Sequence, residues 1–256
     1  MKINPIQFNF IQSKPQSTVS NPLHINKGLQ ADTVSFTGTK KPKKKIEELE
    51  PKHKGIIYKK VRDENGNVIK KIPVEVDIEK WGAGEFQFKI DDECIGFAQL
   101  KHIPAEACNK NSWAELYNDY KEEGVVGDRI EVHYIKNNKE EEYGGIGHLA
   151  DLLEVAACKE MGIKPNVISY AALKAAPMHY MRGKRFIPYE RYCSLDEMEQ
   201  YNLKDKTPDD TIKEIIENTP KGEKFDTSGL DMYLIMYIPK DMIKSLEKEL
   251  KKHPIF

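Results

Sequence analysis

Alternating apolar and polar residues mark the first ordered part of the chain, which begins near Ile56. The pair Asn65-Gly66 separates two such segments and is a hairpin signal, because both residue types tolerate a positive φ. Phe86 and Phe88 alternate with polar neighbours, which is typical of a half-buried strand. The pattern predicts an antiparallel meander of four strands, over residues 56–61, 68–78, 85–90 and 94–100.

A helix and a strand are expected next. Ser112 and Glu115 form a capping box at the start of an apolar stripe that Gly124 ends. Residues 129–136 have the composition of a strand. Strict alternation would place Glu131, His133 and Ile135 on one face, and Ile130, Val132 and Tyr134 on the other.

The rest of the chain, residues 137–256, mixes both element types. Helices are predicted after Gly147, over 175–181, after the N-cap residues Ser194 and Thr207, and over 242–250. Strands are predicted over 167–173, 186–192 and 230–238. The order of the elements predicts a mixed α/β fold, with helices on the faces of a sheet.

Charge divides the chain unevenly. Of its 256 residues, 40 are basic and 41 acidic, yet residues 1–60 hold 12 lysines, no arginine and four acids, a net charge of +8. Residues 1–45 are polar and lysine-rich, so we expect a disordered tail there and a single domain over 46–256. The acidic remainder argues against a specific nucleic-acid partner.

Targeting and redox signals point to the cytoplasm. No apolar run is long enough for a membrane span, so no membrane partner is expected. The start of the chain has no secretory signal pattern. The four cysteines, Cys94, Cys108, Cys158 and Cys193, form no Cys-x-x-Cys pair, which suits a reducing compartment.

A glycine turn, Gly144-Gly145-Ile146-Gly147, opens one predicted helix. Glycines there let backbone N–H groups approach a phosphate closely. A P-loop would need lysine where His148 stands. A dinucleotide fingerprint is matched only in part, because polar residues separate the turn from the preceding strand and no acidic residue ends the following one.

Four motifs occur in order over about ninety residues: Cys94-Ile95-Gly96-Phe97-Ala98, Glu142-Tyr143-Gly144-Gly145-Ile146-Gly147, the segment 156–163, and Ala176-Pro177-Met178-His179-Tyr180 with Gly183 and Phe186. In this order the chain resembles the GNAT family of acetyl-CoA-dependent N-acetyltransferases. The resemblance implies a GNAT-like acyl-CoA N-acyltransferase fold, a central, mostly antiparallel sheet flanked by helices. It also implies acetyl-CoA as co-substrate.

The resemblance assigns roles to particular residues. Tyr180 would protonate the departing thiolate, and Glu131 or His133 would act as general base. Backbone N–H groups of Val132, His133 and Tyr134 would polarise the thioester carbonyl. The phosphates would contact the backbone of Gly144, Gly145, Ile146, Gly147 and His148. The histidines show no spacing typical of metal ligands, so no metal is expected.

Several alternatives stay open from the sequence. The acceptor could be a small-molecule amine or a protein lysine or N-terminus. Residues 194–228 are expected to be an inserted helical segment that shapes the acceptor site. Glu142 stands where the family has Gln or Arg, and the short segment 77–84 replaces two family helices. A non-catalytic acyl-CoA-binding or protein-interaction module on the same fold is therefore the alternative function. The lysine-rich tail could be the chain's own acceptor or a docking arm, and the oligomeric state is open.

Overall fold

A computed structural model of the chain describes residues 44–104, 128–163, 165, 168–191, 193–200, 203, 206–220, 222–228, 230 and 234–256. All of these residues belong to one compact unit, residues 39–256. The helix predicted after Ser112 and nearly all of the predicted tail lie outside the described residues. The same holds for residues 231–233 of the strand predicted over 230–238.

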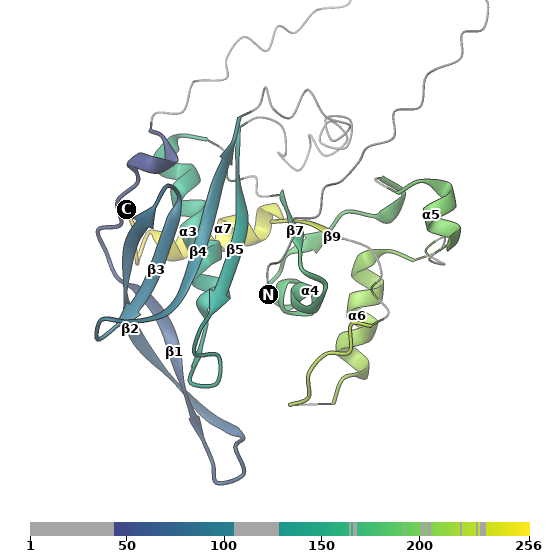
Figure 1. Ribbon diagram of the computed structural model, residues 1–256, viewed down its shortest axis with the longest axis horizontal. Helices are drawn as coiled ribbons and strands as arrows, with labels where there is room; N and C mark the ends of the chain where they lie inside the picture. Colours follow the sequence, from purple (N-terminus) through teal and green to yellow (C-terminus); the bar gives the residue numbers. More distant parts are fainter. Residues whose placement is uncertain are drawn as a thin grey trace, which may run out of the picture. The chain divides into compact units, whose positions relative to one another are not determined.

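Six antiparallel strands form the main sheet, in the order β5-β4-β3-β2-β1-β6 (Figure 1). Their bounds are β1 (Gly55–Arg62), β2 (Val68–Gly82), β3 (Glu85–Ile90), β4 (Glu93–Ile103), β5 (Arg129–Asn137) and β6 (Tyr143–Gly144). The predicted meander is therefore confirmed as β1 to β4. Gly66, with φ +80°, supplies the positive φ that the β1–β2 turn requires.

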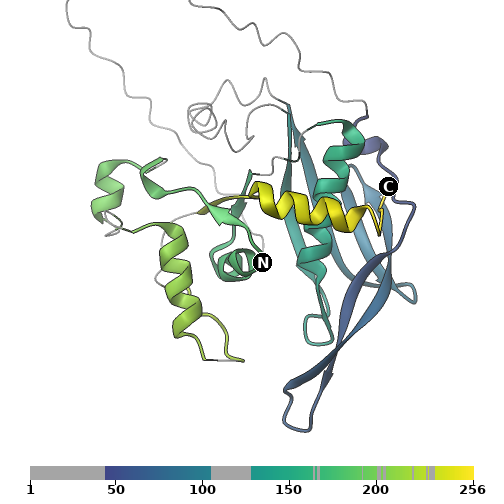
Figure 2. The ribbon, with the colours of Figure 1, turned by 180° about the vertical axis from the view of Figure 1, so that it is seen from behind.

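Two helices, α3 (Ile146–Met161) and α7 (Lys240–Leu250), pack on the same face of this sheet, with α3 next to the strands (Figures 1 and 2). The strands direct residues such as Phe86, Phe88 and Ile130 into the core between sheet and helix. Helix α3 is buried on almost every side, because the sheet covers one flank and α7 another. Charged residues on its inner turns must therefore find partners inside the protein.

A second sheet of three antiparallel strands has β9 (Leu234–Tyr237) at its centre, between β7 (Ile168–Ala171) and β8 (Arg185–Phe186). Helices α4 (Ala176–Met181), α5 (Leu195–Gln200) and α6 (Pro208–Asn218) follow the strands of this part of the chain. Short 3-10 turns are η1 (Ile46–Glu48), η3 (Leu173–Ala175) and η4 (Tyr189–Arg191). A separate apolar cluster, which includes Phe186, Ile212 and Met236, forms the core between the second sheet and its helices.

The strand predicted over 186–192 was wrong beyond its first residue. β8 ends at Phe186, and the chain turns into η4 at Tyr189. Ile187 still donates its N–H to the carbonyl of Ile235 at 2.9 Å. Pro188 has no N–H to continue the ladder, so the apolar residues stay buried without forming a strand.

The mixed α/β class is confirmed, as are both predicted helix caps of the 194–228 segment. Ser194 and Glu197 form the reciprocal bonds of a capping box before α5, and the Thr207 hydroxyl accepts from Asp210 N–H at 3.1 Å before α6. Within the described residues, no helix is both long and apolar enough to cross a membrane.

Candidate functional site

The turn that precedes α3 leaves the start of this helix without a side-chain cap. Gly145 is the N-cap residue, with φ +96° in the left-handed region that favours glycine. The first turn of α3 holds no acidic residue, in contrast to α6, which begins with Asp209 and Asp210. The first N–H groups of a helix lack acceptors within the helix and attract anions. The turn is therefore a candidate anion-binding site.

Arg182, which follows α4, lies directly against this first turn. A Cβ added at Gly147 would stand 2.6 Å from Arg182 Nη1 and 2.8 Å from its Cζ. The guanidinium Nε donates to Asp151 Oδ2 at 2.9 Å, and Nη2 donates to His179 Nδ1 at 2.7 Å. Glycine at position 147 thus makes room for a guanidinium group, a packing requirement that differs from the close ligand approach expected from sequence.

Behind Arg182 lies a buried ionic cluster, formed by Asp151, Glu154, His179, Arg182 and Lys184. Lys184 Nζ is 2.9 Å from Asp151 Oδ1 and 3.7 Å from Glu154 Oε2, and all three side chains are at most 1% exposed. The cluster joins α3 to the segment between α4 and β8. Neither carboxylate oxygen of Glu154 has a hydrogen-bond partner among the described residues.

Burial and the neighbouring cations set the charges of this cluster. Burial opposes ionisation of Asp151, but the charges of Lys184 and Arg182 outweigh it and hold its pKa below the usual range. Burial raises the pKa of Glu154 to about 8. Burial, with help from Lys184 and Arg182, lowers the pKa of His179 to about 3. At neutral pH, Asp151 is ionised, whereas Glu154 and His179 are mostly uncharged.

Several more charged side chains surround the glycine turn. Lys60 Cε would lie 3.3 Å from a Cβ at Gly144, and the Lys60 ammonium donates to the carbonyl of Glu140. Burial, then the charge of Arg62, lowers the pKa of Lys60. The Glu142 carboxylate is largely exposed and 3.9 Å from Lys139 Nζ. The His148 side chain contacts Glu249 of α7, with Nε2 3.0 Å from Oε2. Its backbone N–H is therefore the group that could take the predicted role in phosphate binding.

Strand β5 does not alternate as the sequence predicted. Gln99 of β4 faces Tyr134 and the next residue, Leu100, faces Val132, so His133 is an extra residue in a β-bulge. Beyond the bulge the faces are exchanged. Ile135 therefore packs with Val132 against the core, and Tyr134, predicted to share the face of Val132, stacks on Phe97 with ring centroids 5.3 Å apart.

The bulge lies where β5 is an edge strand. β4 pairs with one edge of β5, while the β7 strand near its other edge belongs to the second sheet and forms no ladder with it. The backbone of His133 has no opposite residue in the β4–β5 register. Its side chain is exposed, Val132 is buried and Glu131 is half-buried. The bulge therefore interrupts the β4–β5 ladder at His133, and the other edge of β5 forms no ladder with a described strand.

Tyr180 lies on α4 and packs partly against the second core. The guanidinium carbon of Arg185 lies 4.6 Å from the centroid of its ring. Tyr180 stands two residues before Arg182, so α4 connects the predicted proton donor to the glycine turn. No hydrogen bond or ion pair among the described residues joins Tyr180 to Glu131 or His133, and the catalytic roles of these three residues stay predictions.

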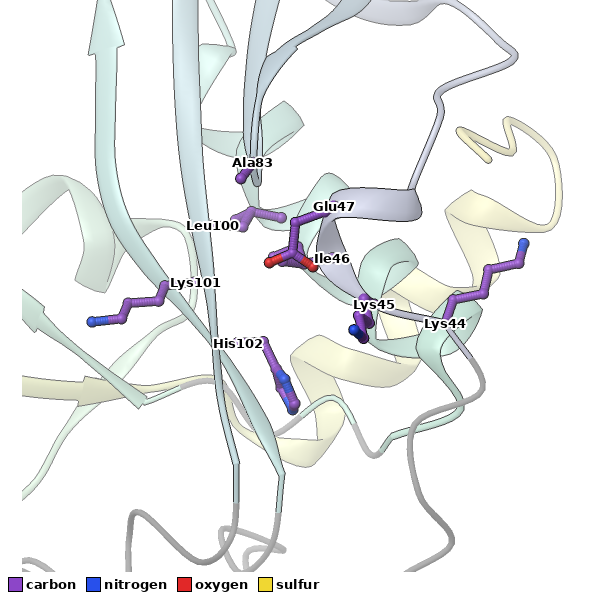
Figure 3. Close-up of a pocket in the computed structure, with 8 residues that line it drawn as sticks. All are labelled: Lys44, Lys45, Ile46, Glu47, Ala83, Leu100, Lys101 and His102. Atoms are coloured by element: carbon purple, nitrogen blue, oxygen red, sulfur yellow. The ribbon is translucent and has the colours of Figure 1, made fainter.

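A pocket of about 570 Å³ lies elsewhere, between η1 and the end of β4 (Figure 3). Its lining includes Lys44, Lys45, Lys101 and His102, and Figure 3 shows the Lys44 and Lys101 side chains extending away from each other. None of the residues predicted to act in catalysis or donor binding lines it. Over the described part of the chain, no group of three or more metal-ligating side chains occurs.

Sequence reasoning missed the buried ionic cluster. A signal was present, because Asp151 and Glu154 interrupt the apolar run of a helix that the pattern buries. Two carboxylates three residues apart on a covered helix require basic partners. The pattern did not indicate that Arg182 and Lys184 are those partners.

Comparisons with known proteins give few matches to this chain. No family model matches the chain, and no curated protein does. One solved structure is similar, that of an insect protein from the yellow fever mosquito described as an arylalkylamine N-acetyltransferase. The match has 11% sequence identity and a TM-score of 0.35, and it covers 61% of this chain and 64% of that one. A likeness of this extent carries no argument about this chain.

Proposed function

We propose that this chain is an N-acetyltransferase of GNAT type, which moves an acetyl group from acetyl-CoA to an amine. One observation carries the proposal: the first turn of α3 has no cap and no acid, and the Arg182 guanidinium lies against it. This is an arrangement suited to the phosphate groups of a nucleotide. The motif order from Cys94 to Phe186 supports the choice of an acyl-CoA over other nucleotides.

The residues present fit such a donor. Gly145, in the left-handed region, is the N-cap residue of α3, and the first N–H groups of this helix have no acceptors within the helix and no side-chain cap. The side chain of Glu142 extends toward Lys139 and is more than half exposed, so it is free to move away from an anion. A bound acyl-CoA supplies the thioester, whose carbonyl carbon is the electrophile.

The bulged edge of β5 is the proposed position of the thioester carbonyl. Backbone N–H groups near His133 would donate to its oxygen and stabilise the negative charge that develops there. The amine nitrogen forms a bond to the carbonyl carbon, and the carbon–sulfur bond breaks. Tyr180 would give its phenolic proton to the departing thiolate, and Glu131 or His133 would take the surplus proton of the amine.

A second candidate is a non-catalytic acyl-CoA-binding module on the same fold. The half-buried position of Tyr180 beneath Arg185 favours this candidate, because a packed ring is less able to reach a thiolate. Both candidates bind the donor, and only the enzyme releases free thiol when an amine is added. The proposed acceptor is a small-molecule amine or a protein amine, and the proposed location is the cytoplasm.

Two measurements test the proposal in sequence. Acetyl-CoA and CoA should raise the melting temperature of the full chain, while NAD should not, since a ligand of the folded state stabilises it. Thiol release with a panel of amines and lysine peptides should then show turnover. No stabilisation by either CoA compound would refute the proposal, and stabilisation without turnover would favour the binding module.

Variants on β5 then test the assignment of the base. Glu131→Gln or His133→Ala should lower the rate of thiol release and change its pH profile, while Lys136→Ala, an exposed residue of the same strand, should not. Unchanged rates at all pH values in both variants would remove these two residues from the mechanism.

A further inference from the structure

Two of the three nitrogens of the Arg182 guanidinium donate hydrogen bonds to neighbouring side chains, and the third has no such bond to the described residues. Asp151 accepts from Nε, and His179 accepts from Nη2 at Nδ1. His179 is able to accept because its pKa lies far below neutrality, which leaves the ring uncharged. The third nitrogen, Nη1, lies beside Gly147 and makes no hydrogen bond to the described residues. The Arg182 side chain is 20% exposed, whereas Asp151 is fully buried.

The charges of the cluster do not cancel. Lys184 lies as close to Asp151 as Arg182 does, 2.9 Å in each case, so one carboxylate faces two cations. Glu154 adds little negative charge at neutral pH, since burial keeps it mostly protonated. The cluster therefore carries an excess positive charge near +1 next to the uncapped start of α3. A mostly buried excess charge is costly unless a counter-ion is supplied.

We infer that Arg182 contacts the phosphate groups of the acyl donor through Nη1, and that Asp151 is the positioning residue that holds its guanidinium there. The inference rests on the proposed function, since it assumes that a phosphate-bearing donor binds at this turn. It also gives a reason for glycine at position 147, because any side chain there would occupy the place of the guanidinium. The resemblance to the family assigns no role to either residue.

A purely structural role is the competing explanation. Arg182 would then serve only to neutralise Asp151 and to attach α4 to α3. The two explanations differ in how an Arg182 variant should change the affinity for donors with and without phosphate. A contact to phosphate affects only donors that carry phosphate, while a structural defect affects every donor.

The experiment measures dissociation constants for CoA, for dephospho-CoA, which keeps the diphosphate, and for pantetheine, which has no phosphate. Arg182→Ala should weaken CoA and dephospho-CoA binding by roughly 10- to 100-fold, the effect expected for a lost charged hydrogen bond. Pantetheine binding should change by less than about twofold. Arg182→Lys should weaken binding less than Arg182→Ala does, because lysine keeps the positive charge but lacks the planar set of guanidinium donors.

Two further variants complete the test. Asp151→Asn should show the same selective loss to a smaller degree, and Lys244→Ala, which removes an exposed charge on α7, should leave all three constants unchanged. If Arg182→Ala does not fold, Arg182→Lys decides the question through its ratio of CoA to pantetheine affinity. Equal losses for all ligands, or no loss for CoA, would overturn the inference while leaving the proposed function intact. A wild-type chain that binds no CoA would overturn both.

Discussion

Replacing Glu154 with glutamine should make the chain more stable at slightly alkaline pH. The Glu154 carboxyl is fully buried, and no hydrogen bond to the described residues satisfies its oxygens. Its pKa is therefore raised from 4.5 to about 8 in the folded state, with burial as the main cause. Glutamine has nearly the same shape as the protonated side chain but cannot ionise.

The sign of the effect follows from where the proton is bound. Between pH 4.5 and pH 8 the folded state keeps a proton on Glu154 that the unfolded state has lost, so the free energy of unfolding falls as the pH rises. The slope is about 1.4 kcal/mol per pH unit well inside this window. From pH 6.5 to pH 8, where the folded group is half ionised, the loss amounts to roughly 1.5 kcal/mol.

Urea unfolding followed by circular dichroism at four pH values between 6.5 and 8 measures this slope. The difference between wild type and Glu154→Gln isolates the carboxyl, since His179 and all other groups titrate in both proteins. Glu160→Gln is the matched control, because Glu160 lies on the same helix but pairs with Lys44 near the surface. Parallel curves for wild type and Glu154→Gln would refute the reasoning.

Three more predictions concern the same region and the segment 194–228. Asp151→Ala should lower the free energy of unfolding by about 3 kcal/mol or more, because it leaves the buried Lys184 ammonium and the Arg182 guanidinium without their shared carboxylate; an unchanged midpoint in urea would contradict this. Gly147→Ala should be destabilising alone but much less so combined with Arg182→Ala, which removes the clashing group, and a double-mutant cycle of unfolding free energies measures the coupling. Thr207→Ala should cost about 1 kcal/mol in thermal or urea unfolding through loss of the α6 cap, and no change would show that this cap is not needed.

The local elements followed from the sequence because their causes are local. The hairpin at Asn65-Gly66, the alternation in β3 and the caps at Ser194 and Thr207 depend on a few residues each. The structure confirms these elements, although only Gly66 of the Asn65-Gly66 pair has a positive φ. Pro188 acts just as locally: its missing N–H prevents the strand from continuing, so the strand predicted across it was wrong although the apolar pattern continues.

Strand pairing decided what local patterns could not. The β-bulge at His133 depends on the register of β4 against β5, and it reversed the faces predicted for Ile135 and Tyr134. The charged cluster is a second case. The sequence placed Asp151 and Glu154 on a covered helix, but only packing of α4 and β8 against α3 brings Arg182 and Lys184 within ion-pair distance.

For the candidate site, the sequence by itself determined the glycine turn and the start of α3, since positive φ and helix initiation are properties of the local chain. Tertiary structure decided what surrounds that turn. It directed the His148 side chain to Glu249 and set Arg182 beside Gly147. Burial then fixed the charges of the neighbouring groups, because the energy of a charge depends on every atom around it and not on its place in the sequence.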